Sequence, residues 1–175
     1  MKYLLDGEET ERLLFRKIKD TDFNDWLVFH QDSSTSLYWN EEKGTPGEEC
    51  NKWYRKQAWR YANDLGGMNA VIEKATGKLI GHCGLLIQSL DNATEMEIAY
   101  SLLPAYWNKG FATEAAVKCR DVAFANKYSS SLISIISVAN IPSEKVAMKI
   151  GMIKDSETVY NANVVNIFRI KNEKH

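Results

Sequence analysis

The stretch that decides the fold is Glu95-Met-Glu-Ile-Ala-Tyr-Ser-Leu-Leu-Pro-Ala-Tyr-Trp-Asn-Lys-Gly-Phe-Ala-Thr-Glu114. Its first half, within residues 94–103, alternates apolar and polar side chains, which predicts a strand with one buried face. Pro104 ends this strand, because proline cannot donate to a sheet ladder. Small residues then recur at helical spacing (Ala112, Ala116, Cys119 and Ala123). The stretch therefore predicts a strand, a loop and a helix that lies close to the sheet.

The start of this helix has the properties of an anion site. The first N–H groups of a helix have no partner within it, and the macrodipole favours negative charge there. Gly110 allows a ligand to approach the main chain closely, so we expect residues 107–113 to bind a phosphate. Neither the G-x-x-x-x-G-K-[ST] loop of nucleoside-triphosphate-binding proteins nor the G-x-G-x-x-G of dinucleotide folds occurs in the sequence.

Residues 106–115 read Tyr-Trp-Asn-Lys-Gly-Phe-Ala-Thr-Glu-Ala. This segment resembles the acetyl-CoA pyrophosphate loop of the GNAT N-acetyltransferases, in the ribosomal-protein N-terminal (RimJ/RimL-like) branch, where Gly is usual in place of Asn108. The resemblance implies acetyl-CoA as cosubstrate and no metal. It also implies that the following residues bind the cofactor: Leu102, Leu103, Trp107, Asn108, Lys109, Gly110, Phe111, Ala112, Thr113, Asn140 and Ser143.

Composition limits the architecture and the partners. The chain has 175 residues, 45% of them hydrophobic, and no Pro/Gly/Ser-rich stretch divides it, so we expect one domain over residues 1–175. A net charge of −1 without a basic block argues against nucleic acid or an anionic membrane as partner. Cys50, Cys83 and Cys119 are far apart in sequence and lack C-x-x-C spacing, which argues against disulfides and zinc. No signal peptide or long apolar run is visible, so we expect a cytoplasmic protein.

Patterning along the chain predicts the remaining elements. The expected strands are residues 10–18, 69–74, 79–88, 94–103, 132–138, 156–160 and 164–170. Helices are expected after Asp22, from the Thr45-Pro-Gly-Glu48 capping box to about Asp64 with Gly66-Gly67 as its stop, after Gly110, and from Asn140 to Ile150. Together with the resemblance, this predicts an α/β (α+β) single-domain GNAT fold, with a mixed, mostly antiparallel central sheet of about seven strands flanked by helices.

Acetyl transfer to an amine needs a base, and Glu97 is our candidate. It projects from the polar face of strand 94–103, where many GNAT relatives have a carboxylate that acts through water. Glu95 lies two residues away on the same face and competes for this role. His82 is another candidate base, although a sheet histidine with a hydrogen-bond partner is the simpler interpretation.

Asn140-Ile-Pro-Ser143 and Lys149-Ile-Gly-Met152 resemble the family's Asn-x-x-[AS] and Lys-x-Gly-Phe segments, whose Asn contacts the cofactor. Asn140 and Ser143 are equally suited to cap a helix. Many GNAT enzymes place a Tyr four residues before this Gly as the acid that protonates the departing thiolate. Ala147 occupies that position here, so Ser143 is the nearest replacement as catalytic acid.

The segment between the first strand and the meander is rich in aromatic residues, which either pack or wall an acceptor cleft. As substrate-binding residues we expect Trp39, Trp53, Glu95 and His82. The branch suggests an acceptor that is a protein N-terminal α-amino group or a small amine. An α-amino group with a pKa of about 7.7–8.0 needs only a modest base, unlike lysine at about 10.4.

Two alternatives stay open at this point. A polyamine or aminoglycoside acetyltransferase would need an acidic cleft, which Glu41, Glu42, Glu48 and Glu49 could supply. A non-catalytic acyl-CoA sensor is consistent with the missing tyrosine. A homodimer is compatible with the sequence.

Overall fold

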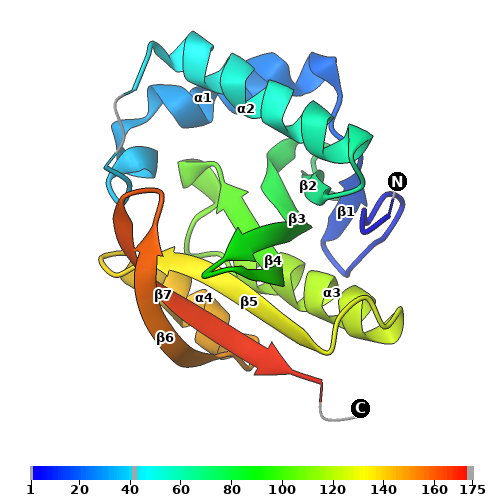
Figure 1. Cartoon of the computed structure of the whole chain (residues 1–175). Coiled ribbons are helices and arrows are strands. Elements are labelled where there is room, and N and C mark those ends of the chain that lie inside the picture. The colour runs from blue at the N-terminus through cyan, green and yellow to red at the C-terminus, as the bar shows by residue number, and fades with distance from the viewer. Residues whose placement is uncertain (1, 41–42, 173–175) are drawn as a thin grey trace.

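The computed structural model describes residues 2–40 and 43–172, so the predictions for Glu41 and Glu42 lie outside the described residues. These residues form a seven-stranded sheet in the order β1-β2-β3-β4-β5-β7-β6 (Figure 1). The strands are β1 (Leu13–Arg16), β2 (Gly66–Glu73), β3 (Leu79–Leu90), β4 (Ala93–Leu102), β5 (Ser131–Ser137), β6 (Ile153–Tyr160) and β7 (Asn163–Lys171). The α-helices are α1 (Phe23–Gln31), α2 (Pro46–Ala62), α3 (Phe111–Ala125) and α4 (Ile141–Lys149). The predicted fold class is confirmed.

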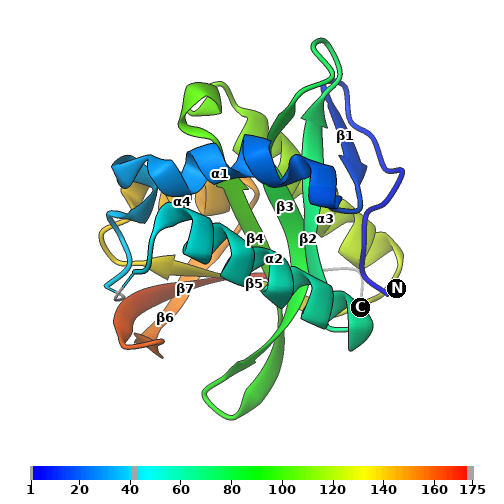
Figure 2. The ribbon, with the colours of Figure 1, turned by 90° about the horizontal axis from the view of Figure 1, so that it is seen from above.

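The helices cover both faces of the sheet. α1 and α2 pack against β3 and β2 on one face, whereas α3 and α4 pack against β3, β4, β5 and β7 on the other (Figures 1 and 2). β4 and β5 are parallel neighbours, and all other neighbouring strands are antiparallel. The sheet is therefore mixed and mostly antiparallel, as expected.

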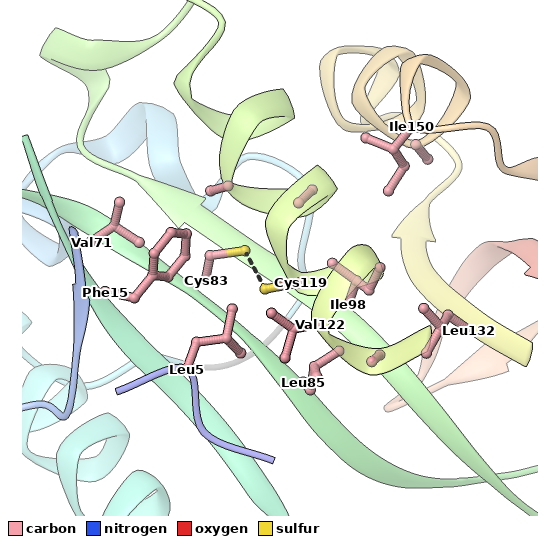
Figure 3. Packing of buried hydrophobic residues seen from close by; sticks show 14 of the residues in the cluster. Leu5, Phe15, Val71, Cys83, Leu85, Ile98, Cys119, Val122, Leu132 and Ile150 are labelled. Atoms are coloured by element: carbon pink, nitrogen blue, oxygen red, sulfur yellow. Dashed lines mark hydrogen bonds between the residues drawn. The ribbon is translucent and has the colours of Figure 1, made fainter. Parts of the chain in front are cut away.

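The main core lies between the sheet and α3. Leu85 of β3, Ile98 of β4 and Val122 of α3 belong to this cluster, which Figure 3 shows from close by. Of the predicted stripe of small residues, Ala116, Cys119 and Ala123 are fully buried, while Ala112 is half-buried. Small side chains allow a helix to approach a sheet closely, and this fixes where the start of α3 lies.

Several boundaries differ from the prediction by two or more residues, and the structure explains those of β1 and α2. β1 is only four residues long, because the chain before it turns toward α3, where Glu114 accepts a hydrogen bond from the Arg12 N–H at 3.0 Å. α2 ends at Ala62, and Gly66-Gly67 begin β2 instead of stopping the helix. A Cβ on Gly66 would lie 2.0 Å from the Leu85 carbonyl oxygen, so this glycine serves the close approach of β2 to β3.

β4 and β5 separate after a single registered pair, Glu97 with Ile133. Beyond it, the Ser134 Oγ donates to the Ile98 carbonyl at 2.8 Å, and the Ile135 N–H donates to the Glu97 carboxylate. Buried backbone groups require partners, so these side chains replace the missing ladder bonds. In the described residues, β4 therefore continues past Ile98 without a β5 pairing, and Glu97 stands where the strands part.

Candidate active site

The loop before α3 is held in a conformation that suits glycine. Gly110 is the N-cap of α3 with φ of +81°, and Asn108 also has positive φ, +59°. A Cβ on Gly110 would meet one neighbour, the Arg12 Nη2 at 3.4 Å, so the space above the first turn is open to a ligand. The N–H groups of Phe111, Ala112 and Thr113 begin the helix there, as the anion prediction requires.

Arg12 and Thr10 clamp this loop to the rest of the molecule. The Arg12 Nη1 donates to the Lys109 carbonyl at 3.0 Å, and its Nε donates to Glu114 at 2.6 Å. Thr10 donates to the same carboxylate at 2.6 Å. Burial raises the pKa of Glu114, but hydrogen bonds from Thr10 and Arg12 outweigh it and the net pKa is lowered. Glu114 is thus an ionised carboxylate whose charge Arg12 balances beside the proposed anion site.

Trp107 fixes the other end of the loop. Its indole Nε1 donates to the Leu102 carbonyl at 2.8 Å, so this nitrogen is used within the protein. The Leu103 N–H donates to the Ile80 carbonyl at 2.9 Å, which contradicts the expectation that Leu103 offers a free donor to the cofactor. Successive N–H groups alternate in direction along a strand, so the N–H of Leu102 points to the opposite side, toward β5. Of the two predicted donors to the cofactor, the Leu102 N–H therefore remains the candidate, and the Leu103 N–H does not.

Glu97 is a buried carboxylate, 8% exposed, at the point where β4 and β5 part. Burial raises its pKa, and a hydrogen bond from Gln88 opposes that shift. The Gln88 Nε2 lies 2.6 Å from the Glu97 Oε2. A carboxylate with a raised pKa and a fixed orientation is suited to accept a proton near neutral pH.

Glu95 is not a competitor for the base, and the prediction that it binds substrate is corrected. Its oxygens accept from both terminal nitrogens of Arg169, at 2.8 and 3.0 Å. This bidentate pair turns both carboxylate oxygens of Glu95 toward Arg169. Sequence patterning missed this because Arg169 lies 74 positions away.

Asn140 and Ser143 lie at the start of α4. The Asn140 side chain accepts from the Ser143 N–H at 3.2 Å, so Asn140 caps the helix. The Tyr100 hydroxyl donates to the Ser143 carbonyl at 2.7 Å and ties β4 to α4 across the parting strands. Ala147 is buried in the core, so its position offers no acid.

Trp53 and His82 belong to a separate aromatic cluster between the sheet, α1 and α2. The His82 ring lies 4.3 Å from that of Trp26 and 4.5 Å from that of Trp53. His82 is fully buried, and neither ring nitrogen has a hydrogen-bond partner within the described residues. The prediction of a hydrogen-bonded sheet histidine is therefore wrong. Burial lowers its pKa to about 3, which leaves it neutral and a poor base. The burial of His82 also removes it from contact with substrate, contrary to prediction.

Trp39 lies apart from this cluster. It packs, as Tyr160 does, against a buried cluster that includes Ile133 of β5, the residue paired with Glu97. The neighbouring Asn40 N–H donates to the Asn163 side chain at 2.8 Å, which joins the segment before α2 to the β6–β7 turn. For Trp39 and Trp53 the substrate-binding role stays a prediction.

The described residues show neither a metal site nor a membrane-spanning helix. Among residues 2–40 and 43–172, no group of three or more His, Cys, Asp or Glu side chains could hold a metal ion. No helix in that part of the chain is long and apolar enough to cross a membrane. A cavity of about 650 Å³ lies between the segment after β1 and α2, lined in part by Lys17, Tyr54 and Tyr61, and it includes neither Glu97 nor Gly110.

Sequence comparison finds a matching family profile and similar bacterial proteins. The profile of the acetyltransferase (GNAT) domain matches residues 12–153. The chain is 31% identical to the uncharacterized protein YkkB of Bacillus subtilis over 147 residues, covering 82% of this chain and 83% of YkkB. It is 30% identical over 158 residues to the uncharacterized N-acetyltransferase p20 of Bacillus licheniformis, with 85% of each chain covered.

A solved structure has a similar fold. The acetyltransferase from Agrobacterium tumefaciens superposes with a TM-score of 0.80 at 23% identity, covering 98% of each chain. At this identity the likeness concerns the fold alone, whereas the profile match spans most of the chain. The chain belongs to the GNAT acetyltransferase family.

Proposed function

We propose that this acetyltransferase moves the acetyl group of acetyl-CoA to a primary amine, with protein N-terminal α-amino groups of the ribosomal-protein type or small amines as acceptors. The observation that carries the proposal is the position of Glu97. This buried carboxylate stands where β4 and β5 part, on the strand that leads into the Gly110 loop. A base and an anion site are thereby joined by one strand and one loop.

The residues present suit acetyl-CoA. The start of α3 offers main-chain donors to a pyrophosphate, with Gly110 allowing close approach and Lys109 supplying an exposed positive charge. The unpaired edge of β4 beyond Ile98, including the Leu102 N–H, suits an extended amide-containing chain, which adds to a strand edge. Trp107, Asn108 and Asn140 shape the loop and the start of α4 around it.

The chemistry follows from these positions. When bound, acetyl-CoA supplies an activated acetyl thioester. Glu97 accepts a proton from the ammonium form of the acceptor through water, so that the neutral amine attacks the carbonyl carbon. A C–N bond forms, the C–S bond breaks and the thiolate leaves, and the second proton lost by the attacking nitrogen passes by way of Ser143 to the thiolate. Ser143 lies at the start of α4 as the proposed proton donor to that thiolate, which with a pKa near 8.5 leaves readily even with weak assistance.

The acceptor class is part of the proposal. A putative ribosomal-protein-serine acetyltransferase and a spermidine N-acetyltransferase, both from Vibrio cholerae, share this fold at 16% and 18% identity. An acidic polyamine cleft finds little support here, since Glu48 closes the capping box with Thr45 and Glu49 accepts from the Gly44 N–H. We also propose one domain over residues 1–175 and a cytoplasmic location.

Turnover with a panel of amines tests the function. The panel comprises peptides with free N-termini, a peptide whose only free amine is a lysine side chain, spermidine and an aminoglycoside, each with acetyl-CoA. We expect the highest kcat/KM with an α-amino acceptor. A preference for spermidine or the aminoglycoside would favour the polyamine or aminoglycoside alternative, and binding of CoA without turnover on any amine would favour the sensor.

A further inference from the structure

Three polar side chains from three different elements form a chain that ends at Glu97. The Arg60 Nη2 of α2 donates to the Gln88 Oε1 of β3 at 2.9 Å. The Gln88 Nε2 then donates to the Glu97 Oε2 of β4 at 2.6 Å. Arg60 and Glu97 are 4% and 8% exposed, so both ends of the chain are buried.

Arg60 is fixed from two sides. Its Nη1 donates to the Leu65 carbonyl at 3.2 Å and to the Ile87 carbonyl at 3.1 Å. A guanidinium is planar, remains protonated and has only donors. The group facing it must therefore be an acceptor, which turns the Gln88 oxygen toward Arg60 and the Gln88 amide nitrogen toward Glu97.

This orientation matters for the protonation of Glu97. An N–H donor aimed at a carboxyl oxygen stabilises the ionised form, whereas a carbonyl oxygen in the same place would stabilise the protonated form. We propose that Arg60 and Gln88 are positioning residues, which hold Glu97 ionised and aimed at the acceptor amine. The inference rests on the proposed function, in which Glu97 is the base.

The charges around Glu97 agree with this arrangement. Burial raises its pKa, and the opposing influences are, in decreasing order, the Gln88 hydrogen bond, the Arg60 charge, the Ile135 N–H and the Lys56 charge. The Glu97 charge also acts on Tyr100 of the same strand, and Tyr160 acts on Arg60. Gln88 and Arg60 together thus supply the main resistance to protonation of the buried base.

The variant Gln88→Leu tests the inference, because it removes the donor to Glu97 with little change of volume. Its matched control is Gln31→Leu, at an exposed position in α1. Arg60→Met forms a second arm, with Arg55→Met as its control, since Arg55 is an exposed arginine of the same helix. Two quantities are measured: the pH profile of kcat/KM, and the titration of the Glu97 carboxyl carbon by NMR, assigned with Glu97→Gln.

We expect Gln88→Leu to raise the midpoints of the kcat/KM profile and of the Glu97 NMR titration by about one pH unit or more. Below the wild-type midpoint, kcat/KM should then fall about tenfold. Above the new midpoint it should return to within about threefold of wild type, with CoA affinity unchanged. A loss that is equal at every pH, or an unmoved NMR midpoint, overturns the inference. Because the NMR titration needs no turnover, it tests the effect of Gln88 on the protonation of Glu97 even if no amine is acetylated and the proposed function fails. If Arg60→Met does not fold, Gln88→Leu alone still tests the inference.

Discussion

At the scale of single residues, burial shifts the acid and base properties of two groups in opposite directions. The strand register puts Glu97 and His82 on the same face of the sheet, since His82 is paired with Ser101 and side chains alternate along β4. Burial favours the neutral form of each, raising the pKa of Glu97 and lowering that of His82 to about 3. Both residues therefore link the protein's behaviour to pH, one through catalysis and the other through stability.

His82 should make the protein less stable in acid. Between its unfolded pKa of about 6.5 and its folded value of about 3, the unfolded chain binds the extra proton, so stability falls as the pH is lowered. From pH 7.5 to 5.0 this contribution is about 2 kcal/mol. We expect His82→Phe, which keeps an aromatic ring against Trp26, to lose about that much of the pH dependence of the unfolding free energy, measured by urea titration. An unchanged pH dependence in the variant would show that His82 is accessible to protons in the folded state.

Residue-level prediction succeeded where local pattern determines the outcome and failed where a distant partner does. The alternation of residues 94–103 correctly predicted the strand β4, but not that Glu97 on its polar face is buried. The same pattern cannot distinguish Glu95 from Glu97, because the difference comes from Arg169 on one side and from Gln88 and burial on the other. The roles of Arg60 and Tyr100 were likewise invisible in the sequence, since their partners lie on other elements.

At the scale of elements, the loop before α3 concentrates the proposed anion binding. We expect Gly110→Val to weaken CoA binding by about tenfold or more, because a β-branched residue resists positive φ and its side chain fills the space above the first turn. The matched control is Gly77→Val in the β2–β3 turn, where φ is +68° and no atom lies within 4 Å of an added Cβ. Calorimetry should show lost affinity only for Gly110→Val. Equal affinity for both variants, with the fold intact, would remove the loop from cosubstrate binding.

The parting of β4 from β5 depends on Ser134. Its hydroxyl satisfies the Ile98 carbonyl, and the residue is 2% exposed, so Ser134→Ala leaves a buried acceptor unpaired. We expect a loss of about 1–3 kcal/mol in the free energy of unfolding, against less than about 0.5 kcal/mol for Ser89→Ala at an exposed strand position. Denaturant titrations of the two variants make the comparison. A loss no larger than that of Ser89→Ala would mean that the strands close and pair directly.

At the scale of the whole molecule, the fold brings together groups that the sequence keeps apart. Element types were predictable from period and caps, as with the Thr45 capping box that begins α2. The chain turn at Thr10 and Arg12, by contrast, depends on Glu114, more than 100 positions away. The two cysteines Cys83 and Cys119 provide another example, with their Sγ atoms 3.5 Å apart in the core (Figure 3).

This proximity does not make the cysteines catalytic. Both are fully buried and so are closed to substrate, and burial raises the pKa of Cys119 well above its ordinary value. We expect the triple variant Cys50→Ala, Cys83→Ala, Cys119→Ala to be less stable, owing to the cavities left in the core, yet to keep its kcat within about threefold. An acetylated cysteine trapped by mass spectrometry, or a folded variant without turnover, would indicate transfer through the enzyme instead of direct attack.

The proposed role of Glu97 is to take the proton of the acceptor amine, and the pH dependence of Glu97→Gln is the test of that role. With one amine acceptor at saturating acetyl-CoA, we predict that kcat/KM at pH 7 is about 10 to 10⁴-fold below wild type, with CoA affinity unchanged. The defect should shrink toward pH 9, because more of the amine is then already neutral. A defect of the same size at pH 9 as at pH 7, or no defect at all, would contradict the role of Glu97 as the base.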